Sequence, residues 1–160
     1  RQLANANQDM AYIGIESHRS GVGRLLMSLQ EDALTNVKVL IDDAVDILTT
    51  RIASRSVDEF LIFFPDPWPK KRHHKRRLVN TDFLSSLARC LKPNGLIHIA
   101  TDWDDYAKAI VDLIRAESRL HNLSKQGFSP RPASRPETKY ERRGVRLGHQ
   151  VYDIIARRCP

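Results

Sequence analysis

The chain has 160 residues, of which 41% are hydrophobic and 28% are charged, and its formal net charge is +7. This length favours one globular domain with a sizeable core. We expect no membrane-spanning helix, because there is no long apolar run, and we find no signal-peptide core in the polar first nine residues and no disulfide framework from two isolated cysteines. The basic balance favours a polyanionic partner, and the cysteine usage favours a reducing, cytoplasmic setting.

Strand and helix patterns alternate along the chain. Short apolar runs at 11–16, 37–43, 60–64, 96–100 and 149–158 predict strands, and the apolar spacings at 22–29, 44–52, 83–91 and 103–118 predict helices. Repeated strand–helix–strand units of this kind predict an α/β fold with a doubly wound, mostly parallel sheet. Lys92-Pro-Asn-Gly95 is expected to form a type I turn, and the polar stretch 124–148 is expected to be a functional loop.

Four acidic residues stand at or just beyond the predicted strand ends: Glu16, Asp43, Asp66 and Asp102. In open α/β sheets, ligands bind outside the carboxyl ends of the strands. The alternative is that each carboxylate caps the helix that follows it. Four such residues along one predicted edge favour a ligand crevice.

The most informative stretch is 60–77, where an apolar strand leads into Pro65-Asp66-Pro67 and then into a basic run. Six of the eight residues at 70–77 are Lys or Arg. A run that abuts a buried strand lies inside the fold, so we interpret it as a phosphate-binding surface and not as a solvated tail. Trp68 either stacks on a base or fills the crevice. The adjacent histidines lack partners at ligand spacing, and no metal is expected.

Three segments resemble the bacterial tRNA (guanine-N7-)-methyltransferases: Phe64-Pro-Asp-Pro-Trp68, Ala100-Thr-Asp-Trp103 and Thr138-Lys-Tyr-Glu141. The segments at 13–18, 43–45 and 131–137 are similar to that family in order and spacing, so the resemblance covers essentially the whole chain. It implies a class I, Rossmann-like methyltransferase fold with S-adenosylmethionine as methyl donor. The implied target is the guanine at position 46 in the variable loop of tRNA.

The resemblance also implies roles for individual residues. Asp66 is the implied catalytic residue. The implied cofactor-binding residues are Glu16, Asp43 and Asp66. The implied substrate-binding residues are Lys70, Asp102, Thr138, Lys139, Tyr140 and Glu141. The implied RNA-contacting residues are Arg72, His73, His74, Lys75, Arg76 and Arg77.

The family's first strand and its glycine-rich donor loop precede the segment that Ile13-Gly-Ile-Glu16 matches. We therefore expect residues 1–160 to form a single, N-terminally truncated methyltransferase domain that lacks this strand and loop. The alternative function is a non-catalytic or partner-dependent RNA-binding module, which would have no physical need for all four carboxylates. We expect tRNA as partner, no membrane, no obligate protein partner, a monomer or homodimer, and a cytoplasmic location.

Overall fold

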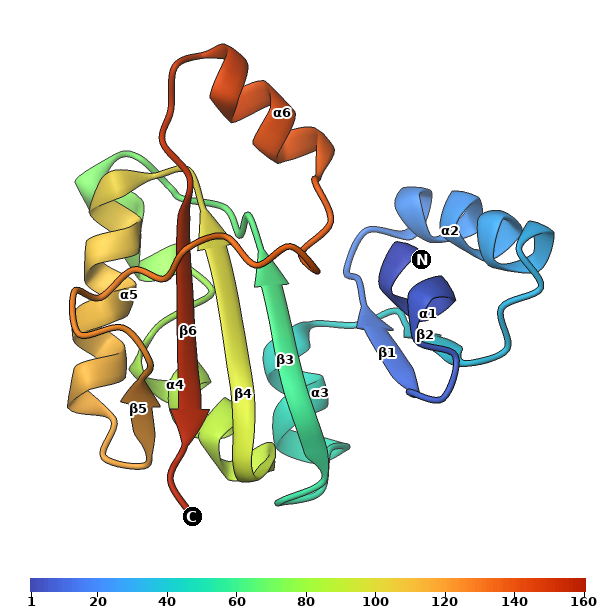
Figure 1. Cartoon of the computed structure of the whole chain (residues 1–160), viewed down its shortest axis with the longest axis horizontal. Helices are drawn as coiled ribbons and strands as arrows, with labels where there is room; N and C mark the ends of the chain where they lie inside the picture. The colour runs from blue at the N-terminus through green and yellow to red at the C-terminus, as the bar shows by residue number, and fades with distance from the viewer. The chain divides into compact units, whose positions relative to one another are not determined.

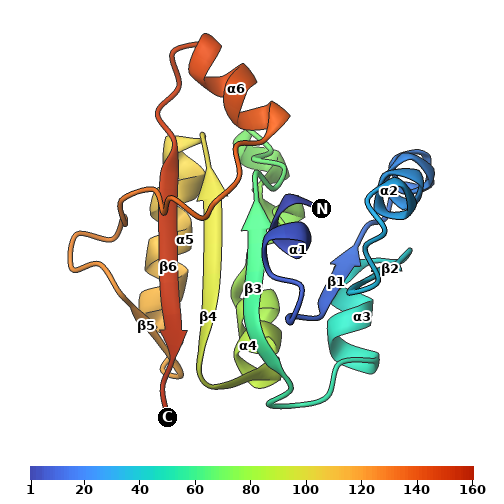
Figure 2. The same ribbon diagram turned by 45° about the vertical axis from the view of Figure 1, so that its right-hand side comes forward.

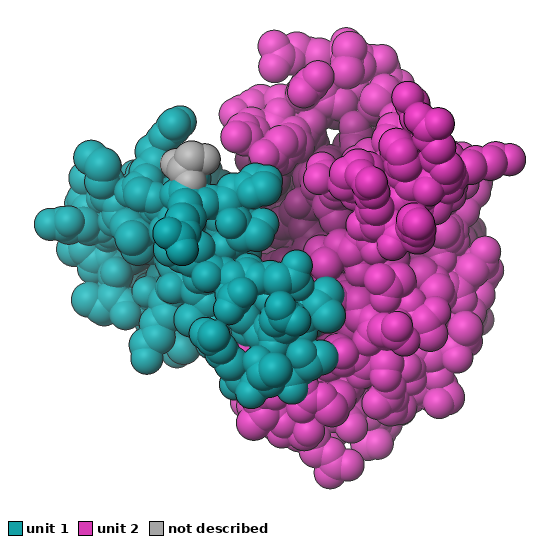
Figure 3. Space-filling view, turned by 180° about the vertical axis from the view of Figure 1, so that it is seen from behind, with its two compact units in different colours: residues 1–51 teal, residues 52–160 magenta. Residues whose placement is uncertain are grey.

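The computed structural model describes residues 1–160, except for the side chain of Ser20. The chain forms two compact units, Arg1–Arg51 and Ile52–Pro160 (Figure 3). The single domain expected from the sequence stays a prediction.

The first unit contains two short parallel strands and three helices. Its elements are α1 (Gln2–Ala6), β1 (Tyr12–Ile15), α2 (Arg19–Glu31), β2 (Val37–Leu40) and α3 (Ala44–Thr50). β1 and β2 run in register from Tyr12↔Val37 to Ile15↔Leu40. Both strands therefore end at the same edge, and Glu16 and Asp43 follow at that edge.

The second unit holds a four-stranded sheet in the order β3-β4-β6-β5 (Figure 1). Its elements are β3 (Val57–Phe63), the 3-10 helix η1 (Lys71–Arg76), α4 (Thr81–Cys90), β4 (Leu91–Thr101), α5 (Asp104–Ala116), β5 (Leu120–Asn122), α6 (Lys139–Arg146) and β6 (Tyr152–Arg158). β3 and β4 are parallel, whereas β6 is antiparallel to both β4 and β5. The carboxyl ends of β3 and β4 therefore meet at the edge where β6 begins.

α4 and α5 cover one face of this sheet (Figures 1 and 2). The apolar side chains of β4 meet the two helices, and Ile97, Ile99 and Ile110 are completely buried. Burying one such side chain contributes about 1.5–3 kcal/mol. This core fixes the sheet edge on which the candidate site stands.

The predicted strands all form, with shifted ends, but the type I turn at Lys92–Gly95 is wrong. Asn94 has φ 64°, whereas the third residue of a type I turn has a negative φ. These residues form an irregularity inside β4, across which the pairing passes from Val57↔Leu91 to Glu59↔Leu96. Gly95 is needed there, because a Cβ would lie 2.9 Å from the Asp58 carbonyl oxygen.

Four elements were not predicted: α1, η1, β5 and α6. α6 lies within the stretch 124–148, which was predicted to be a functional loop. The helix lies beyond the carboxyl end of β4 (Figure 1). Ion pairs and hydrogen bonds hold it there, in place of an apolar stripe.

Candidate active site

Asp66 stands on a loop whose backbone is strained at two places. Phe64 and Trp68 have φ 57° and 44°, a region that costs a non-glycine residue roughly 1–2 kcal/mol. The Phe64 N–H donates to the Ala100 carbonyl at 2.7 Å, which joins the start of the loop to β4. Asp66 itself is exposed, and its carboxylate accepts no hydrogen bond from the described part of the chain. Such strained, over-determined backbone is typical of functional sites.

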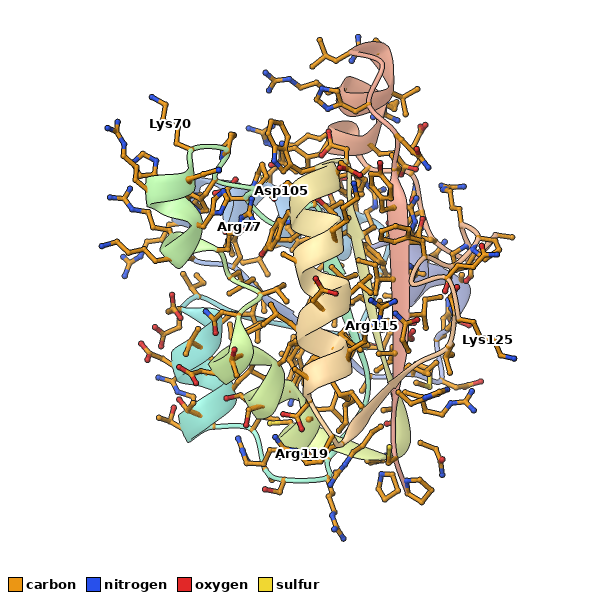
Figure 4. All side chains as sticks on the ribbon, turned by 90° about the vertical axis from the view of Figure 1, so that its left-hand side faces the viewer. Lys70, Arg77, Asp105, Arg115, Arg119 and Lys125 are labelled. Carbon is orange, nitrogen blue, oxygen red and sulfur yellow. The ribbon has the colours of Figure 1, made fainter. Side chains whose placement is uncertain are left out.

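Arg77 joins the Asp66 loop to α5. Its Nε donates to the Pro67 carbonyl at 2.8 Å and its Nη2 donates to Asp105 Oδ2 at 2.6 Å. The guanidinium also lies over the Tyr106 ring, 4.6 Å from its centroid, and Arg77 is only 6% exposed. Figure 4 shows Arg77 and Asp105 side by side between η1 and α5.

The surroundings of Arg77 shift the pKa values of two neighbouring groups, Asp105 and Tyr106. The hydrogen bond from Arg77 lowers the pKa of the Asp105 carboxyl. Burial raises the pKa of the Tyr106 hydroxyl to about 12, and the negative charge of Asp66 adds to that shift. The Tyr106 oxygen accepts a hydrogen bond from the Val79 N–H at 2.9 Å, which ties α5 to the chain after the basic run.

The basic run forms η1 and presents most of its cations to solvent. The exposed members are Lys70, Lys71, Arg72, Lys75 and Arg76. Lys70 points away from the sheet (Figure 4). Arg77 differs from this set because it is buried and paired, so its implied contact with RNA stays a prediction that its burial disfavours.

Trp68 packs against the basic run. The Arg76 guanidinium lies 5.0 Å from the centroid of its ring, and the His73 ring meets it edge-on at 5.9 Å. The neighbouring His74 instead has its Nε2 3.7 Å from Asp105 Oδ2. Whether Trp68 stacks on a base or fills the crevice stays a prediction.

A buried ion-pair network fastens the segment 131–141 to the sheet. Arg135, which is 3% exposed, makes a two-pronged pair with Glu141, with both N···O distances at 2.7 Å. Its Nε lies 2.7 Å from Asp153 Oδ1 as an ion pair without hydrogen-bond geometry. His98 Nε2 approaches the same Asp153 oxygen at 2.6 Å. Arg135 also lies 5.9 Å from the Phe64 ring centroid, so the network reaches the base of the Asp66 loop.

The implied substrate-binding residues of this segment have structural partners. Thr138 caps α6, since its Oγ1 accepts from the Glu141 N–H at 3.1 Å. Burial raises the pKa of Glu141, but the hydrogen bonds and charge of Arg135, together with the charge of Arg131 and the Thr138 contact, outweigh burial, and the net pKa is lowered. Tyr140 is 55% exposed, with the Lys139 Nζ 5.0 Å from its ring centroid. Only Lys139 and Tyr140 are turned outward.

Asp102 lines a pocket of about 380 Å³ together with residues 103–105, His149, Gln150 and Tyr152. It was considered as a possible cap of α5, but the N-cap is Trp103. The Asp102 carboxylate instead meets the His149 ring, with Oδ2 2.9 Å from Nδ1. Since Asp102 does not cap the helix and only its Oδ2 meets His149, its other oxygen is available for a ligand.

In the first unit, Asp43 does cap a helix: its Oδ1 accepts from the Val45 N–H at 2.7 Å at the start of α3. Glu16 accepts from the His18 N–H through Oε1 at 2.8 Å. Both residues are exposed, and each keeps a second carboxylate oxygen. Capping and ligand binding are therefore compatible at both positions.

Among the described residues, no cluster of His, Cys, Asp and Glu side chains suited to a metal ion occurs. Within the same residues, no helix is both long enough and apolar enough to cross a membrane.

Sequence reasoning missed Arg77 as a loop anchor, and it missed Arg135, His149 and Asp153 altogether. No sequence signal separates Arg135 from Arg131, four residues earlier in the same basic segment. Their difference comes from the acidic partners that the fold supplies.

Comparison with known proteins gives a family and a fold. Residues 1–154 match the family described as "Putative methyltransferase". A tRNA (guanine-N(7)-)-methyltransferase of Legionella pneumophila (strain Corby) is 51% identical over 154 residues, which are 96% of this chain and 68% of that protein. A protein of the same name from Nitrosospira multiformis is 47% identical, with 98% and 68% covered. The chain thus spans about two thirds of the length of these relatives.

Solved structures of methyltransferases share the fold. A SAM-dependent O-methyltransferase from Thermotoga maritima has a TM-score of 0.57 at 16% identity, covering 94% of this chain and 50% of that one. An rRNA methylase from Streptococcus thermophilus has a TM-score of 0.59 at 8% identity, covering 94% and 74%. The predicted class I, Rossmann-like fold is confirmed.

Proposed function

The chain belongs to the family of tRNA (guanine-N(7)-)-methyltransferases, and we propose that its reaction is methyl transfer from S-adenosylmethionine to N7 of a guanine in tRNA. The proposed target is the guanine at position 46 in the variable loop, which the sequence motifs imply. A tRNA substrate agrees with the cytoplasmic setting that the cysteine pattern predicts. The relatives carry the name of an enzyme, which speaks against the alternative of a non-catalytic RNA-binding module.

The residues at the strand ends of the first unit fit the donor. Glu16 and Asp43 follow paired parallel strands, are exposed, and keep an oxygen that is not used locally. Carboxylates in such positions accept hydrogen bonds from ribose hydroxyls or from the exocyclic amine of a base. S-adenosylmethionine supplies a sulfonium methyl group, whose bond to sulfur breaks as the bond to guanine N7 forms.

The nucleophile needs no general base. Guanine N7 has an in-plane lone pair and carries no proton, so no proton has to be removed before it reacts. The protein has to hold the base in a reactive alignment and stabilise the positive charge that develops on the purine. A fixed carboxylate does both, and Asp66 provides one.

Asp66 recognises guanine through its hydrogen-bonding edge in this proposal. Its carboxylate accepts from the N1–H and the 2-amino group, which become more acidic as N7 is alkylated. Adenine has no proton on the corresponding ring nitrogen and is rejected. The exposed carboxylate on a strained loop, fixed by Arg77 and by the Phe64 link to β4, is the observation that carries the proposal.

The exposed cations of η1 bind the tRNA backbone in this proposal. Lys70 is closest to the Asp66 loop in sequence and is proposed to contact the substrate near the reacting base. The remaining proposed contacts with phosphates are Arg72, His73, His74, Lys75 and Arg76. Phosphate contacts give affinity and register without sequence specificity.

The test is replacement of Asp66. Asp66→Ala is expected to lower single-turnover methyl transfer by about 10²–10³-fold while leaving tRNA affinity nearly intact. Asp66→Asn keeps a carbonyl acceptor but loses the charge, and an intermediate rate is expected. A variant that retains most of the wild-type rate would remove Asp66 from the reaction.

A further inference from the structure

The Asp102 carboxylate is contacted by two nearby residues, Gly144 in α6 and His149 just after that helix. Its Oδ2 accepts from Nδ1 of His149, and its side chain is only 24% exposed. A carboxylate can only accept, so Nδ1 carries the proton in this contact. α6 lies beyond the carboxyl end of β4, where the chain reaches Asp102 (Figure 1).

Gly144 touches the same carboxylate with its backbone. A Cβ built at this position would lie 2.4 Å from Asp102 Oδ2 and 3.1 Å from its Cγ. Glycine is a poor helix former, yet Gly144 stands inside α6, in its last turn. The close approach of the helix to Asp102 accounts for it.

His149 is fixed in turn by α6 and by the start of α5. Its backbone N–H donates to the Gly144 carbonyl at 3.0 Å, after Gly148 turns the chain with φ 80°. The Trp103 ring meets the His149 ring edge-on, with centroids 6.2 Å apart. The imidazole therefore has a defined orientation when it meets Asp102.

We propose that Gly144 and His149 are positioning residues that hold one oxygen of Asp102, so that the other faces a base bound in the pocket of residues 102–105. A pocket of about 380 Å³ is large enough for a purine. A carboxylate with one oxygen engaged presents its other oxygen to a base N–H in a single geometry. The inference rests on the proposed function, which makes Asp102 a substrate contact.

The first experiment measures the contact through stability alone. Gly144→Ala is expected to lower Tm by about 5 °C or more, because overpacking outweighs the better helix propensity of alanine. In an Asp102→Ala background the loss is expected to shrink clearly, since the 2.4 Å contact with Oδ2 is gone and the nearest remaining atom of residue 102 is Cβ at 3.2 Å. Gly23→Ala in α2 is the matched control: its added methyl meets nothing within 4 Å, and Tm is expected to hold or rise.

The second experiment measures the consequence for the reaction. His149→Leu removes the N–H and is expected to lower kcat/KM for tRNA about tenfold, the usual effect of losing one charge-assisted hydrogen bond. His149→Asn offers an amide N–H in nearly the place of Nδ1 and is expected to stay within about threefold of wild type. Rescue by asparagine is a result that a purely structural role would not give.

Two outcomes would overturn the inference: an equal Tm loss from Gly144→Ala with and without the Asp102 carboxylate, or a His149→Asn variant as impaired as His149→Leu. A wild-type protein that transfers no methyl to tRNA would overturn the proposed function and the kinetic half of this inference together. The Tm cycle would still decide whether Gly144 contacts and constrains Asp102.

Discussion

Arg76 and Arg77 are neighbours in the basic run but do different work. Arg76 is exposed and covers Trp68, whereas Arg77 is buried and holds the Pro67 carbonyl, Asp105 and the Tyr106 ring. The sequence gives both the same basic context, so their difference could not be predicted from it. It arises from α5, which brings an acid and an aromatic ring beneath only one of the two.

Arg77→Ala should therefore destabilise the protein far more than Arg76→Ala. The first variant leaves the Pro67 carbonyl without its donor and opens a gap over Tyr106, and it is expected to cost about 2–3 kcal/mol. Most of the cost comes from those two losses, because Asp105 is 61% exposed and its pair with Arg77 is screened. The second variant should stay within about 0.5 kcal/mol of wild type. Urea unfolding of both variants is the measurement, and equal losses would contradict the anchoring role.

At the scale of elements, α6 depends on ion pairs. Arg135 and Arg131 both contact Glu141, but the side chain of Arg135 is 0% exposed and that of Arg131 is 44% exposed. Removing one partner of a buried pair leaves the other charge buried and unpaired, whereas an exposed pair contributes little. The two arginines thus form a matched comparison around one acid.

We expect Arg135→Ala to cost about 3–5 kcal/mol, since Glu141 and Asp153 would both lose their buried partner. Arg131→Ala should cost less than about 1 kcal/mol. Calorimetric or denaturant unfolding measures both values. Similar costs for the two variants would mean that burial does not decide the strength of these pairs.

The Glu141–Arg135 pair should also make the protein sensitive to acid. The net pKa of Glu141 is lowered in the folded protein, so its contribution is complete above the ordinary glutamate pKa of about 4.3 and is lost as pH falls below it. Glu141→Gln should be less stable than wild type at pH 7 and should lose less stability between pH 5 and pH 3. Two parallel curves of unfolding free energy against pH would exclude this pair as a source of the acid sensitivity.

The sequence predicted the strands well and α6 poorly, for physical reasons. Buried strands such as β3 and β4 can be predicted from their apolar runs. α6 is only eight residues long, is charged at most positions and has a glycine in its interior, so it has too few apolar residues to predict a helix. Its stability depends on Arg135, which lies outside the helix, and on Asp102, which is distant in the sequence. Asp66 could be located because it follows a strand end, and Lys70 because it belongs to a family motif, whereas partners such as His149 become visible only after folding.

At the scale of the whole molecule, the net positive charge is confined to the second unit, Ile52–Pro160. Residues 1–51 hold five Lys or Arg and seven Asp or Glu, a net charge of −2, whereas residues 52–160 hold 21 and 12, a net charge of +9. A polyanion is therefore attracted to the unit that carries η1 and α6. The first unit, with Glu16 and Asp43, adds nothing to that attraction.

This distribution predicts that η1 acts through phosphates. Neutralising a phosphate releases counterions, so the logarithm of the affinity falls linearly with the logarithm of the salt concentration, by about 0.7–0.9 per contact. Replacing Arg72, Lys75 and Arg76 together by alanine should weaken tRNA binding and flatten this slope by roughly two to three units. Arg77 stays in place, so the Asp66 loop keeps its anchor. Unrelated tRNAs should lose affinity in parallel.

Choice of the guanine should survive in the triple variant, because Asp66 and Asp102 are proposed to read the base and neither is changed. Mapping N7-methylguanosine in tRNA treated with wild type and variant decides this point. Slower methylation at an unchanged position is the expected result. Methylation at other guanines would mean that the cations of η1 select the site by setting the register of the RNA, and base recognition by the carboxylates would then be the weaker of the two determinants.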